Sequence, residues 1–371
     1  MRSAVPLVRV VRSGLEESVH LGHVAVCDAD GRLVAWAGDP DHLVFGRSCT
    51  KPLQGAVSLT AIGAPGLQPD SEIAIMCSSH NGEPVHVRAV RSVLRRAGLG
   101  PGSLRNPPGW PIDEASMARA RHQDRLLHNC SGKHAGMVLA CIRAGWDPAT
   151  YLRRSHPLQR RILRAVLRAT DRQEVPLGVD GCGVPVHGVR VREMATMYAR
   201  FGRPDRMGDL SPGIERAVRA MLAEPYLVGG RDRGDTAIMS LTGDVLAKSG
   251  AETLECAAAL GPGFGVAVKI ADGSWRAGAP AIIAVLHQLG ALSHDQLDAL
   301  HDHARPPVMG GGRQVGELVP DVALRGASRL RHEARTRNSY ADDPPADLPR
   351  TRNIPGPAHH FPAGGGNPQR G

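Results

Sequence analysis

The sequence is poor in aromatic residues, since Phe, Trp and Tyr make up only 3% of its 371 residues. Ala, Val, Leu and Ile must therefore fill most of the core, which the hydrophobic content of 42% permits. Long apolar runs are missing too, because no window approaches the roughly 18 apolar residues of a membrane span. The beginning of the chain lacks the sustained apolar stretch of a secretory signal peptide. We therefore expect neither membrane association nor export.

A concentrated positive charge is also missing. The formal net charge is +9, but residues 325–371 hold eight Arg against four Asp or Glu, so that the rest of the chain carries only +5. A nucleic-acid-binding protein clusters its charge and adds stacking aromatic residues, and the sequence has no such cluster. Its seven cysteines are odd in number and scattered, which predicts reduced thiols in a cytoplasmic protein rather than a disulfide framework.

Strand-like segments lie at both ends of the chain, and helix-like segments lie between them. Residues 5–38 read as strands around the turn DADG, and strand patterns return in residues 244–278, where ADG predicts a second hairpin turn. Residues 72–79 fit either a buried strand or the start of a helix. Helical spacing predicts helices at 49–63, 84–97, 131–144, 156–170, 191–202, 212–225, 279–292 and 294–304. This order predicts an α+β fold, in which an antiparallel sheet from both chain ends carries an inserted helical subdomain.

The composition changes at about residue 326. Residues 341–371 contain seven Pro and five Gly in 31 positions, with little to bury. We therefore predict one domain over residues 1–325, followed by a disordered Pro/Gly/Arg-rich tail over residues 326–371.

A serine and a lysine stand three residues apart in the segment GRSCTKPLQ. On a helix Ser48 and Lys51 would share one face, and a desolvated Lys51 could accept the proton of the serine. Pro52 suits the first turn of such a helix, where its missing N–H is not needed. The plain alternative is that Ser48 caps the helix and Lys51 faces solvent, so the pair alone is a weak signal.

Two further short motifs follow along the chain. Residues 79–81 read Ser-His-Asn after an apolar run, and residues 248–250 read Lys-Ser-Gly at the end of an apolar strand. Serine β-lactamases and penicillin-binding proteins carry S-x-x-K, S-x-N and K-[ST]-G in this chain order. Each motif alone is better explained by a turn, but the three in order indicate a serine hydrolase. The last strand would add a cation and a backbone donor for an oxyanion.

Two cysteines stand in the motifs HNCSGKHAG and VDGCGVP. Cys130 and Cys182 are too few for a structural site of four cysteines, but with a nitrogen or carboxylate ligand they could hold zinc and leave one position open. His128, His134 and Asp180 are nearby candidates for that ligand. The alternative is that Cys130 is a small core residue and that Cys182 belongs to a Gly-rich turn.

Taken in chain order, the segments GRSCTKP, CSSHNGEP, HNCSGKHAGM, DGCGVP, GGRDRGDTAIM and KSGAE resemble the Rhizobium-etli-type L-asparaginases, the asparaginase II family. The resemblance covers about residues 6–320, and HNCSGKHAGM and DGCG-P are specific to that family. The family's fold resembles serine β-lactamases and glutaminases, which agrees with a sheet built from both chain ends. The resemblance implies hydrolysis of L-asparagine to L-aspartate and ammonia.

The resemblance also implies two Ser–Lys tandems, Ser48 with Lys51 and Ser79 with Lys248, although Lys269 also ends a strand and competes with Lys248. It further implies a zinc site in which a lysine, having lost its proton, joins two cysteines. The implied zinc ligands are Cys130, Lys133 and Cys182. The residues expected to bind substrate or to orient the zinc ligands are Arg47, His80, Asn81, Glu83, His134, Asp180, Ser249 and Gly250.

The resulting hypothesis is a covalent route on a small-molecule substrate, with no nucleic-acid partner and with a homodimer suggested by the resemblance. Lys51 accepts the proton of Ser48, Ser48 attacks the side-chain amide, and Ser79 with Lys248 protonates the leaving ammonia. Zinc would orient the substrate without forming the nucleophile. One alternative is another amidase or a penicillin-binding or β-lactamase-like hydrolase, which the missing secretion signal disfavours. The other is a non-catalytic binding protein whose basic tail contacts nucleic acid.

Overall fold

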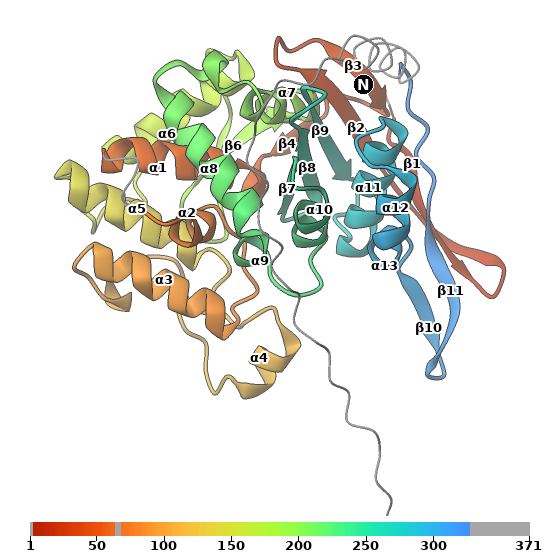
Figure 1. Cartoon of the computed structure of the whole chain (residues 1–371), viewed down its shortest axis with the longest axis horizontal. Helices are drawn as coiled ribbons and strands as arrows, with labels where there is room; N and C mark the ends of the chain where they lie inside the picture. Colours follow the sequence, from red (N-terminus) through yellow and green to blue (C-terminus); the bar gives the residue numbers. More distant parts are fainter. Residues whose placement is uncertain (1–2, 64–67, 327–371) are drawn as a thin grey trace, which may run out of the picture.

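The large sheet is built from both ends of the chain (Figure 1). The computed structural model describes residues 3–63 and 68–326. The antiparallel strands follow the order β10-β11-β1-β2-β9-β8-β7, and β3 pairs with β2 beside this path. The predicted α+β fold is therefore confirmed. The strands are β1 (Val5–Arg12), β2 (Leu15–Asp28), β3 (Leu33–Ala37), β7 (Val245–Gly250), β8 (Leu254–Ala259), β9 (Phe264–Ile270), β10 (Pro307–Gly310) and β11 (Arg313–Pro320).

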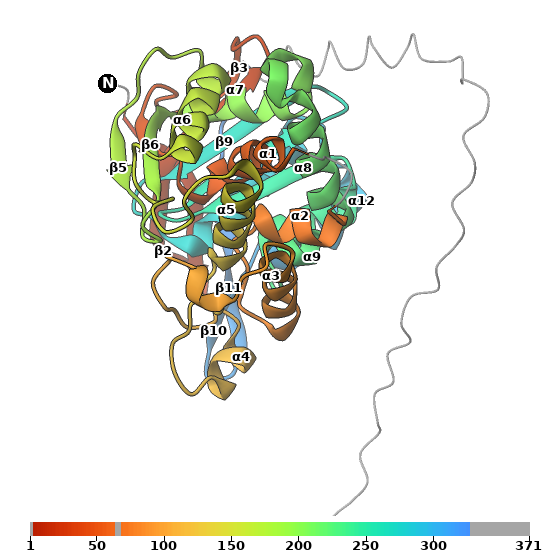
Figure 2. The same cartoon turned by 90° about the vertical axis from the view of Figure 1, so that its left-hand side faces the viewer.

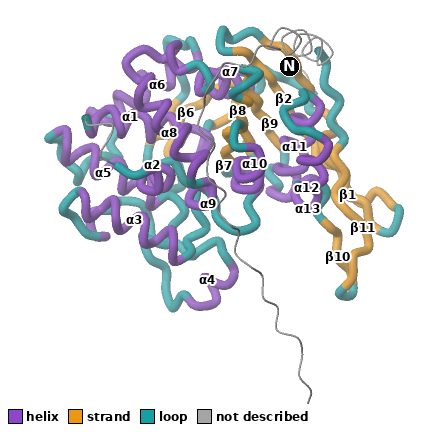
Figure 3. Tube along the Cα trace, in the orientation of Figure 1, coloured by secondary structure: helices purple, strands orange, loops and turns teal. Residues whose placement is uncertain are grey.

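A helical subdomain is inserted between β3 and β7, and in Figure 3 most helices lie on one side of the molecule and the large sheet on the other. Helix α1 is its central helix and packs against α5, α6 and α8 (Figure 2). Residues 72–79 prove to be helix and loop rather than strand. The helices are α1 (Lys51–Ile62), α2 (Asp70–Met76), α3 (Pro84–Arg96), α4 (Glu114–Arg119), α5 (Ser131–Ala144), α6 (Pro157–Thr170), α7 (Val191–Phe201), α8 (Ser211–Ala223), α9 (Pro225–Val228) and α10 (Gly234–Thr242).

Helices cover both faces of the large sheet. Helix α7 packs on β2, β8 and β9, while α11 (Gly278–Gln288) lies on the opposite face with α12 (His294–Ala299) and α13 (His301–Ala304). Helix α7 approaches β9 at Gly265, where a Cβ atom would collide with the carbonyl oxygen of Ala195. Because both faces are covered, β7 and β8 are buried along their whole length, including the polar side chains of Lys248, Ser249 and Glu255.

A small second sheet joins the helical subdomain to the large sheet. Its strands β4 (Leu43–Phe45), β6 (Pro185–Arg190) and β5 (Leu177–Val179) pair in the order β4-β6-β5. Strand β4 leads into the short 3₁₀ helix η1 (Arg47–Thr50), and β5 leads into the turn that carries Cys182. This sheet therefore places two of the predicted motifs side by side.

The C-terminal third differs in part from the prediction. The ADG of residues 271–273 does not join two strands, because the chain turns there into a 3₁₀ helix and α11. The hairpin lies earlier, between β8 and β9, where Gly263 has a φ of 79°. Strands β10 and β11 were not predicted, and residues 294–304 form two short helices. From residue 327 onward the predicted tail lies outside the described residues.

Over residues 3–63 and 68–326, no helix has both the length and the apolar character needed to cross a membrane.

Candidate active site

Ser48 lies in η1, directly before α1, and its side chain is largely buried. Pro52 occupies the first turn of α1, as predicted. Arg47, the first residue of η1, has a φ of 42°, a conformation that residues other than glycine rarely adopt and that is concentrated at functional sites. Cys49 anchors this segment to the large sheet, because its thiol lies 3.1 Å from the carbonyl oxygen of Lys248 and 3.0 Å from that of Leu254.

Lys51 pairs with Ser79 rather than with Ser48. Its Nζ lies 2.8 Å from Ser79 Oγ and donates to the carbonyl oxygen of Ser78 at 2.6 Å. Burial lowers the pKa of Lys51 to about 8; Cys130 opposes this shift, and the cations Lys133 and Lys248 add to it. The spacing S-x-x-K thus identified a lysine that can act as a base, but the serine directly bonded to it comes from the second motif.

Lys248 also differs from the prediction. Its Nζ lies 3.3 Å from Asp235 Oδ2 and donates to the carbonyl oxygen of Ser249 at 2.7 Å, and within the described ranges it makes no hydrogen bond to Ser79. The backbone N–H of Ser249 donates to the same carboxylate oxygen at 3.1 Å, and the oxyanion donor expected from this strand stays a prediction. Lys248 is therefore the partner of a carboxylate, and the predicted Ser79–Lys248 tandem is wrong as a direct contact.

Asp235 and Arg233 are the site residues that the sequence analysis missed. Burial alone would raise the pKa of Asp235, but the positive charges of Lys248 and Arg233 outweigh it and hold that pKa below its ordinary value. Arg233 Nη1 donates to the carbonyl oxygen of Ser79 and to Oδ1 of Asn81, both at 3.2 Å. Both residues lie in the motif GGRDRGDTAIM, where the one signal is a lone acidic residue at the start of an apolar helix.

The residues that follow Ser79 hold its loop in place. His80 uses both ring nitrogens, since Nδ1 accepts from the backbone N–H of Gly82 and Nε2 donates to the hydroxyl of Ser131. Glu83 accepts from the hydroxyl of Tyr226 at 2.5 Å and from the backbone N–H of Arg231 at 3.1 Å. The amide of Asn81 donates to the carbonyl oxygen of Arg231. These contacts assign His80, Asn81 and Glu83 to loop structure, and a role in substrate binding stays a prediction.

Gly250, another predicted substrate contact, has a packing function. A Cβ atom there would lie 3.0 Å from Cys49 Sγ, so the glycine lets η1 approach β7 closely. The Lys-Ser-Gly motif thus contributes to the site through Lys248 and through the close contact between the strand and η1.

The predicted metal ligands converge beside this site. Lys133 Nζ lies 3.0 Å from Cys182 Sγ, and Cys130 and Cys182 interact so that the pKa of Cys130 is raised and that of Cys182 is lowered. The hydrogen bond from Cys130 and the charge of Lys133 lower the pKa of Cys182 against the effect of burial. Asp180 Oδ1 accepts from Arg47 Nε at 2.9 Å, and Oδ2 lies 3.9 Å from Cys182 Sγ.

This donor set fits zinc in composition. Two cysteine sulfurs and one lysine nitrogen, all buried, would provide three protein ligands and leave a fourth position open. No group of three or more His, Cys, Asp and Glu side chains arranged to hold a metal occurs in the part of the chain that the structure describes. Nδ1 of His128 accepts from the backbone N–H of Cys130, so this nitrogen holds the turn before α5 and does not bond to the side chains of the cluster.

His134 presents an unpaired donor in the same region. The hydroxyl of Tyr151 accepts from the backbone N–H of Arg105 at 2.9 Å, so its own hydrogen points to His134 Nδ1 at 2.6 Å. On this pattern we assign the ring proton to Nε2, and this buried nitrogen has no hydrogen-bond partner among residues 3–63 and 68–326. An unpaired buried donor is costly, which supports the prediction that His134 contacts a ligand.

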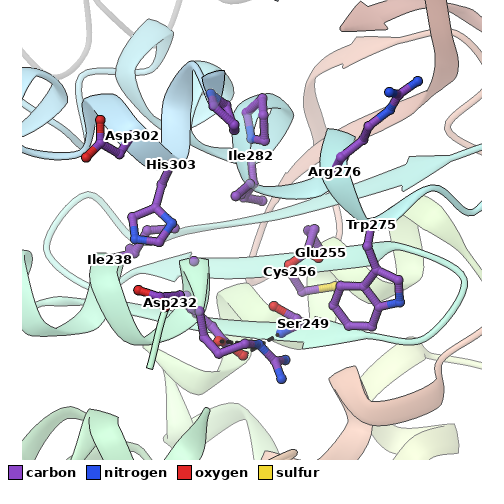
Figure 4. Close-up of a pocket in the computed structure, with 17 residues that line it drawn as sticks. Asp232, Ile238, Ser249, Glu255, Cys256, Trp275, Arg276, Ile282, Asp302 and His303 are labelled. Carbon is purple, nitrogen blue, oxygen red and sulfur yellow. Dashed lines mark hydrogen bonds and ion pairs between the residues drawn. The ribbon is translucent and has the colours of Figure 1, made fainter. Parts of the chain in front are cut away.

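A cavity of about 510 Å³ adjoins the site on the other side of β7. Figure 4 shows the rings of His303 and Trp275 on opposite sides of it, with Ser249 and Glu255 between them. Burial, followed by the charge of Asp235, raises the pKa of Glu255 to about 7. The lining does not include Ser48, Lys51 or Ser79, so we place the chemistry at the Ser–Lys cluster and not in this cavity.

The family of the chain is established by its sequence. A family model described as L-asparaginase II matches residues 8–320, and the chain belongs to this family. The search of curated proteins gave no significant match.

Solved structures of low sequence identity are similar to the chain. They include Mglu in its native form (17% identity, 74% of this chain and 66% of that chain covered, TM-score 0.43). A β-lactamase from Mycobacterium bovis matches at 14% identity, with 72% and 94% covered and a TM-score of 0.42. A probable glutaminase matches at 16% identity, with 72% and 85% covered and a TM-score of 0.42.

Proposed function

We propose that this amidohydrolase is a Rhizobium-etli-type L-asparaginase that hydrolyses L-asparagine to L-aspartate and ammonia. Membership of the L-asparaginase II family supports the reaction class. The observation that carries the proposal within the site is the buried contact of 2.8 Å between Lys51 and Ser79, next to Ser48 at the start of α1. A buried lysine with a lowered pKa can be neutral near physiological pH, and only a neutral amine can accept a proton.

The reaction would proceed through an acyl-enzyme. Ser48 Oγ forms a bond to the side-chain amide carbon, and its proton passes to the neutral amine of Lys51, whose hydrogen-bond partner in the structure is Ser79 rather than Ser48. Lys51 and its partner Ser79 then deliver that proton to the leaving nitrogen, which departs as ammonia when the C–N bond breaks. Water attacks the ester with Lys51 as the base, and L-aspartate leaves. The charge of Lys248, held by Asp235, favours the neutral form of Lys51 during these steps.

We also propose that Cys130, Lys133 and Cys182 bind zinc. When bound, the metal would supply a fixed positive charge that orients a polar group of the substrate. Asp180 lies beside Cys182 and would keep Arg47 in place, while the free N–H of His134 would donate to the substrate. Cys182 is presented by the turn of residues 180–183, in which Gly183 has a φ of 91°.

The deciding experiment is ammonia release from L-asparagine, L-glutamine and D-asparagine, measured side by side with metal analysis of the same sample. We expect the highest kcat/KM for L-asparagine and about one zinc ion per chain. No release from L-asparagine would refute the proposed activity, and faster release from L-glutamine would change the assigned substrate. A sample that is active without metal would refute a catalytic need for zinc.

A cytosolic location is part of the proposal. It is supported by the seven cysteines, all of which are buried and free of disulfides. A homodimer remains a prediction from the resemblance, which the mass of the purified protein in solution tests directly.

A further inference from the structure

Asp235 is the acceptor for several groups of the site. Its Oδ2 receives Lys248 Nζ at 3.3 Å and the backbone N–H of Ser249 at 3.1 Å. Its Oδ1 accepts from the backbone N–H of Thr236 at 3.1 Å and lies 3.8 Å from Arg233 Nε. The side chains of Lys248 and Asp235 are 0% and 1% exposed. A carboxylate so fully buried is stable only because each oxygen is paired.

Arg233 extends this network to the serine loop. Its Nη1 reaches the carbonyl oxygen of Ser79 and the side chain of Asn81, and its guanidinium lies 5.4 Å from the ring centroid of Trp275. The backbone adds two bonds, because the N–H groups of Ser79 and Asn81 donate to the carbonyl oxygens of Val228 and Gly229. The segment before α10 therefore holds the serine loop, and Asp235 in the first turn of α10 holds strand β7.

We propose that Asp235 is a positioning residue of the amidase site, which holds Lys248 as a fixed cation and, through Arg233, sets the Ser79 loop against β7. This role rests on the proposed function, although the contacts do not depend on it. Asp235 touches no reacting atom. It acts through Lys248, whose charge favours the neutral amine of Lys51, and through Arg233, which sets the position of the hydroxyl bonded to that amine.

The surroundings of Lys248 make the role of Asp235 specific. The titratable groups that interact with the charge of Lys248 come from four other parts of the chain: Lys51 of α1, Cys77 after α2, Asp235 of α10, and Glu255 and Cys256 of β8. Burial raises the pKa of Glu255 to about 7, and it raises the pKa values of Cys77 and Cys256, which favours their neutral forms. Asp235 is thus the reliable counter-charge of Lys248 below neutral pH.

The test compares Asp235→Asn with Asp232→Asn, which changes an exposed carboxylate on the same loop. Asp232 has a φ of 56°, a conformation that asparagine tolerates, so the control keeps the backbone. Thermal unfolding is measured from pH 5 to 10 for both variants and for the wild type, because Glu255, whose pKa burial raises to about 7, can replace the missing counter-charge at higher pH. Without a counter-charge, a buried lysine gives up its proton at a lower pH than a lysine in water.

The sign of the expected effect follows from proton binding. In Asp235→Asn, burial without a counter-charge favours the neutral amine in the folded state, while the unfolded state keeps its lysines protonated up to about pH 10, so stability should rise with pH. The deficit in melting temperature should therefore be largest at pH 5 and shrink as the pH rises toward 10, whereas Asp232→Asn should follow the wild type. A deficit that is constant with pH, or no deficit, would overturn the proposal.

A double variant covers the case in which Asp235→Asn folds poorly. Replacing both partners, as in Asp235→Asn with Lys248→Met, removes the uncompensated charge and should raise the melting temperature above that of Asp235→Asn alone. A melting temperature equal to or lower than that of Asp235→Asn would count against an ion pair between Asp235 and Lys248. Neither measurement needs activity, so an inactive wild type would refute the proposed function and leave this result interpretable.

The activity measurement separates positioning from general damage. Asp235→Asn should lower kcat about 10- to 100-fold at pH 7, by analogy with other outer-shell groups, with little change in KM. In Asp235→Ala, formate can enter from the adjoining cavity, which Asp235 lines, and should restore part of kcat in proportion to its concentration. Sodium chloride at equal ionic strength is the control. Rescue by both salts alike, or by neither, would overturn the assignment of Asp235 as a counter-charge.

Discussion

Lys51 and Lys133 are both fully buried lysines on neighbouring helices, yet their pKa values move in opposite directions. Burial lowers the pKa of Lys51 to about 8, because its bonded partners are a hydroxyl and a carbonyl oxygen. Burial would also lower the pKa of Lys133, but the charges of Cys182, Cys130 and Asp180 outweigh it and raise that pKa above its ordinary value. Burial alone therefore does not turn a lysine into a base. The charge of the groups around it decides whether its pKa falls or rises.

The two lysines therefore have different proposed roles in adjacent regions of the site. The region of Lys51 can accept and return a proton, whereas the region of Lys133 holds a charged pair until a metal displaces its proton. Separate variants of each region test this division.

The largest effect is expected for the proposed nucleophile. Ser48→Ala should lower kcat by about 10⁴-fold or more, as for other serine nucleophiles, and should leave the zinc content unchanged. Ser58→Ala is the matched control, since Ser58 is a buried serine of α1 whose hydroxyl donates to the carbonyl oxygen of Gln54 within the same helix. Steady-state kinetics and metal analysis provide the measurements, and an active Ser48→Ala protein would rule out the acyl-enzyme on this residue.

The next effect concerns the base. Because only the neutral amine of Lys51 accepts a proton, kcat/KM should rise as the pH increases through about 8. Lys51→Arg keeps the charge at all pH values and should lower kcat about 10²- to 10⁴-fold, the usual contribution of a general base. A wild-type profile that is flat between pH 6 and 9 would show that Lys51 is not the base.

A smaller effect is expected in the other region. Cys182→Ala removes the thiolate beside Lys133 and should reduce zinc content while raising KM for L-asparagine about 10- to 100-fold. Cys141→Ala serves as the control, because Cys141 is a buried thiol of α5 away from the cluster. Unchanged zinc content and KM in Cys182→Ala would exclude the proposed metal site.

The smallest effect tests the orientation of His134. In Tyr151→Phe the hydrogen bond to His134 Nδ1 is lost, so the ring proton is no longer confined to Nε2. KM should increase about tenfold or less, which corresponds to one hydrogen bond, and kcat should change little. A change confined to kcat would place His134 in the chemistry instead of in substrate binding.

Much of the fold could be predicted, because local patterns determine it. The hairpin around DADG, helices α1, α3 and α5–α8, and the return to strands in the C-terminal third are all visible in short windows. Strands β10 and β11 were missed because their place in the sheet depends on the pairing of β11 with β1, which joins residues far apart in the sequence, while β10 pairs with β11. The ADG turn was misjudged for a related reason: a glycine turn after a strand leads equally well into a helix.

The sequence predicted which residues belong to the candidate site better than it predicted which of them are hydrogen-bonded to one another. The motifs identified Lys51, Ser79, Lys133 and Cys182, which the structure joins in two buried pairs. Spacing suggested Ser48 for Lys51 and the family resemblance implied Ser79 for Lys248, and both pairings differ from the observed hydrogen bonds. Asp235 and Arg233 went unassigned, since nothing near them in the sequence shows what they contact.

By itself, the sequence determined the α+β order of elements, the family and the residue types that can carry out amide hydrolysis. Side-chain chemistry and local periodicity are properties of short segments, so they can be read directly. Only the tertiary structure decided that Lys51 bonds to Ser79 and Lys248 to Asp235. Whether a buried lysine is neutral or charged depends on what lies within about 4 Å of it, and packing brings those groups together from distant parts of the chain.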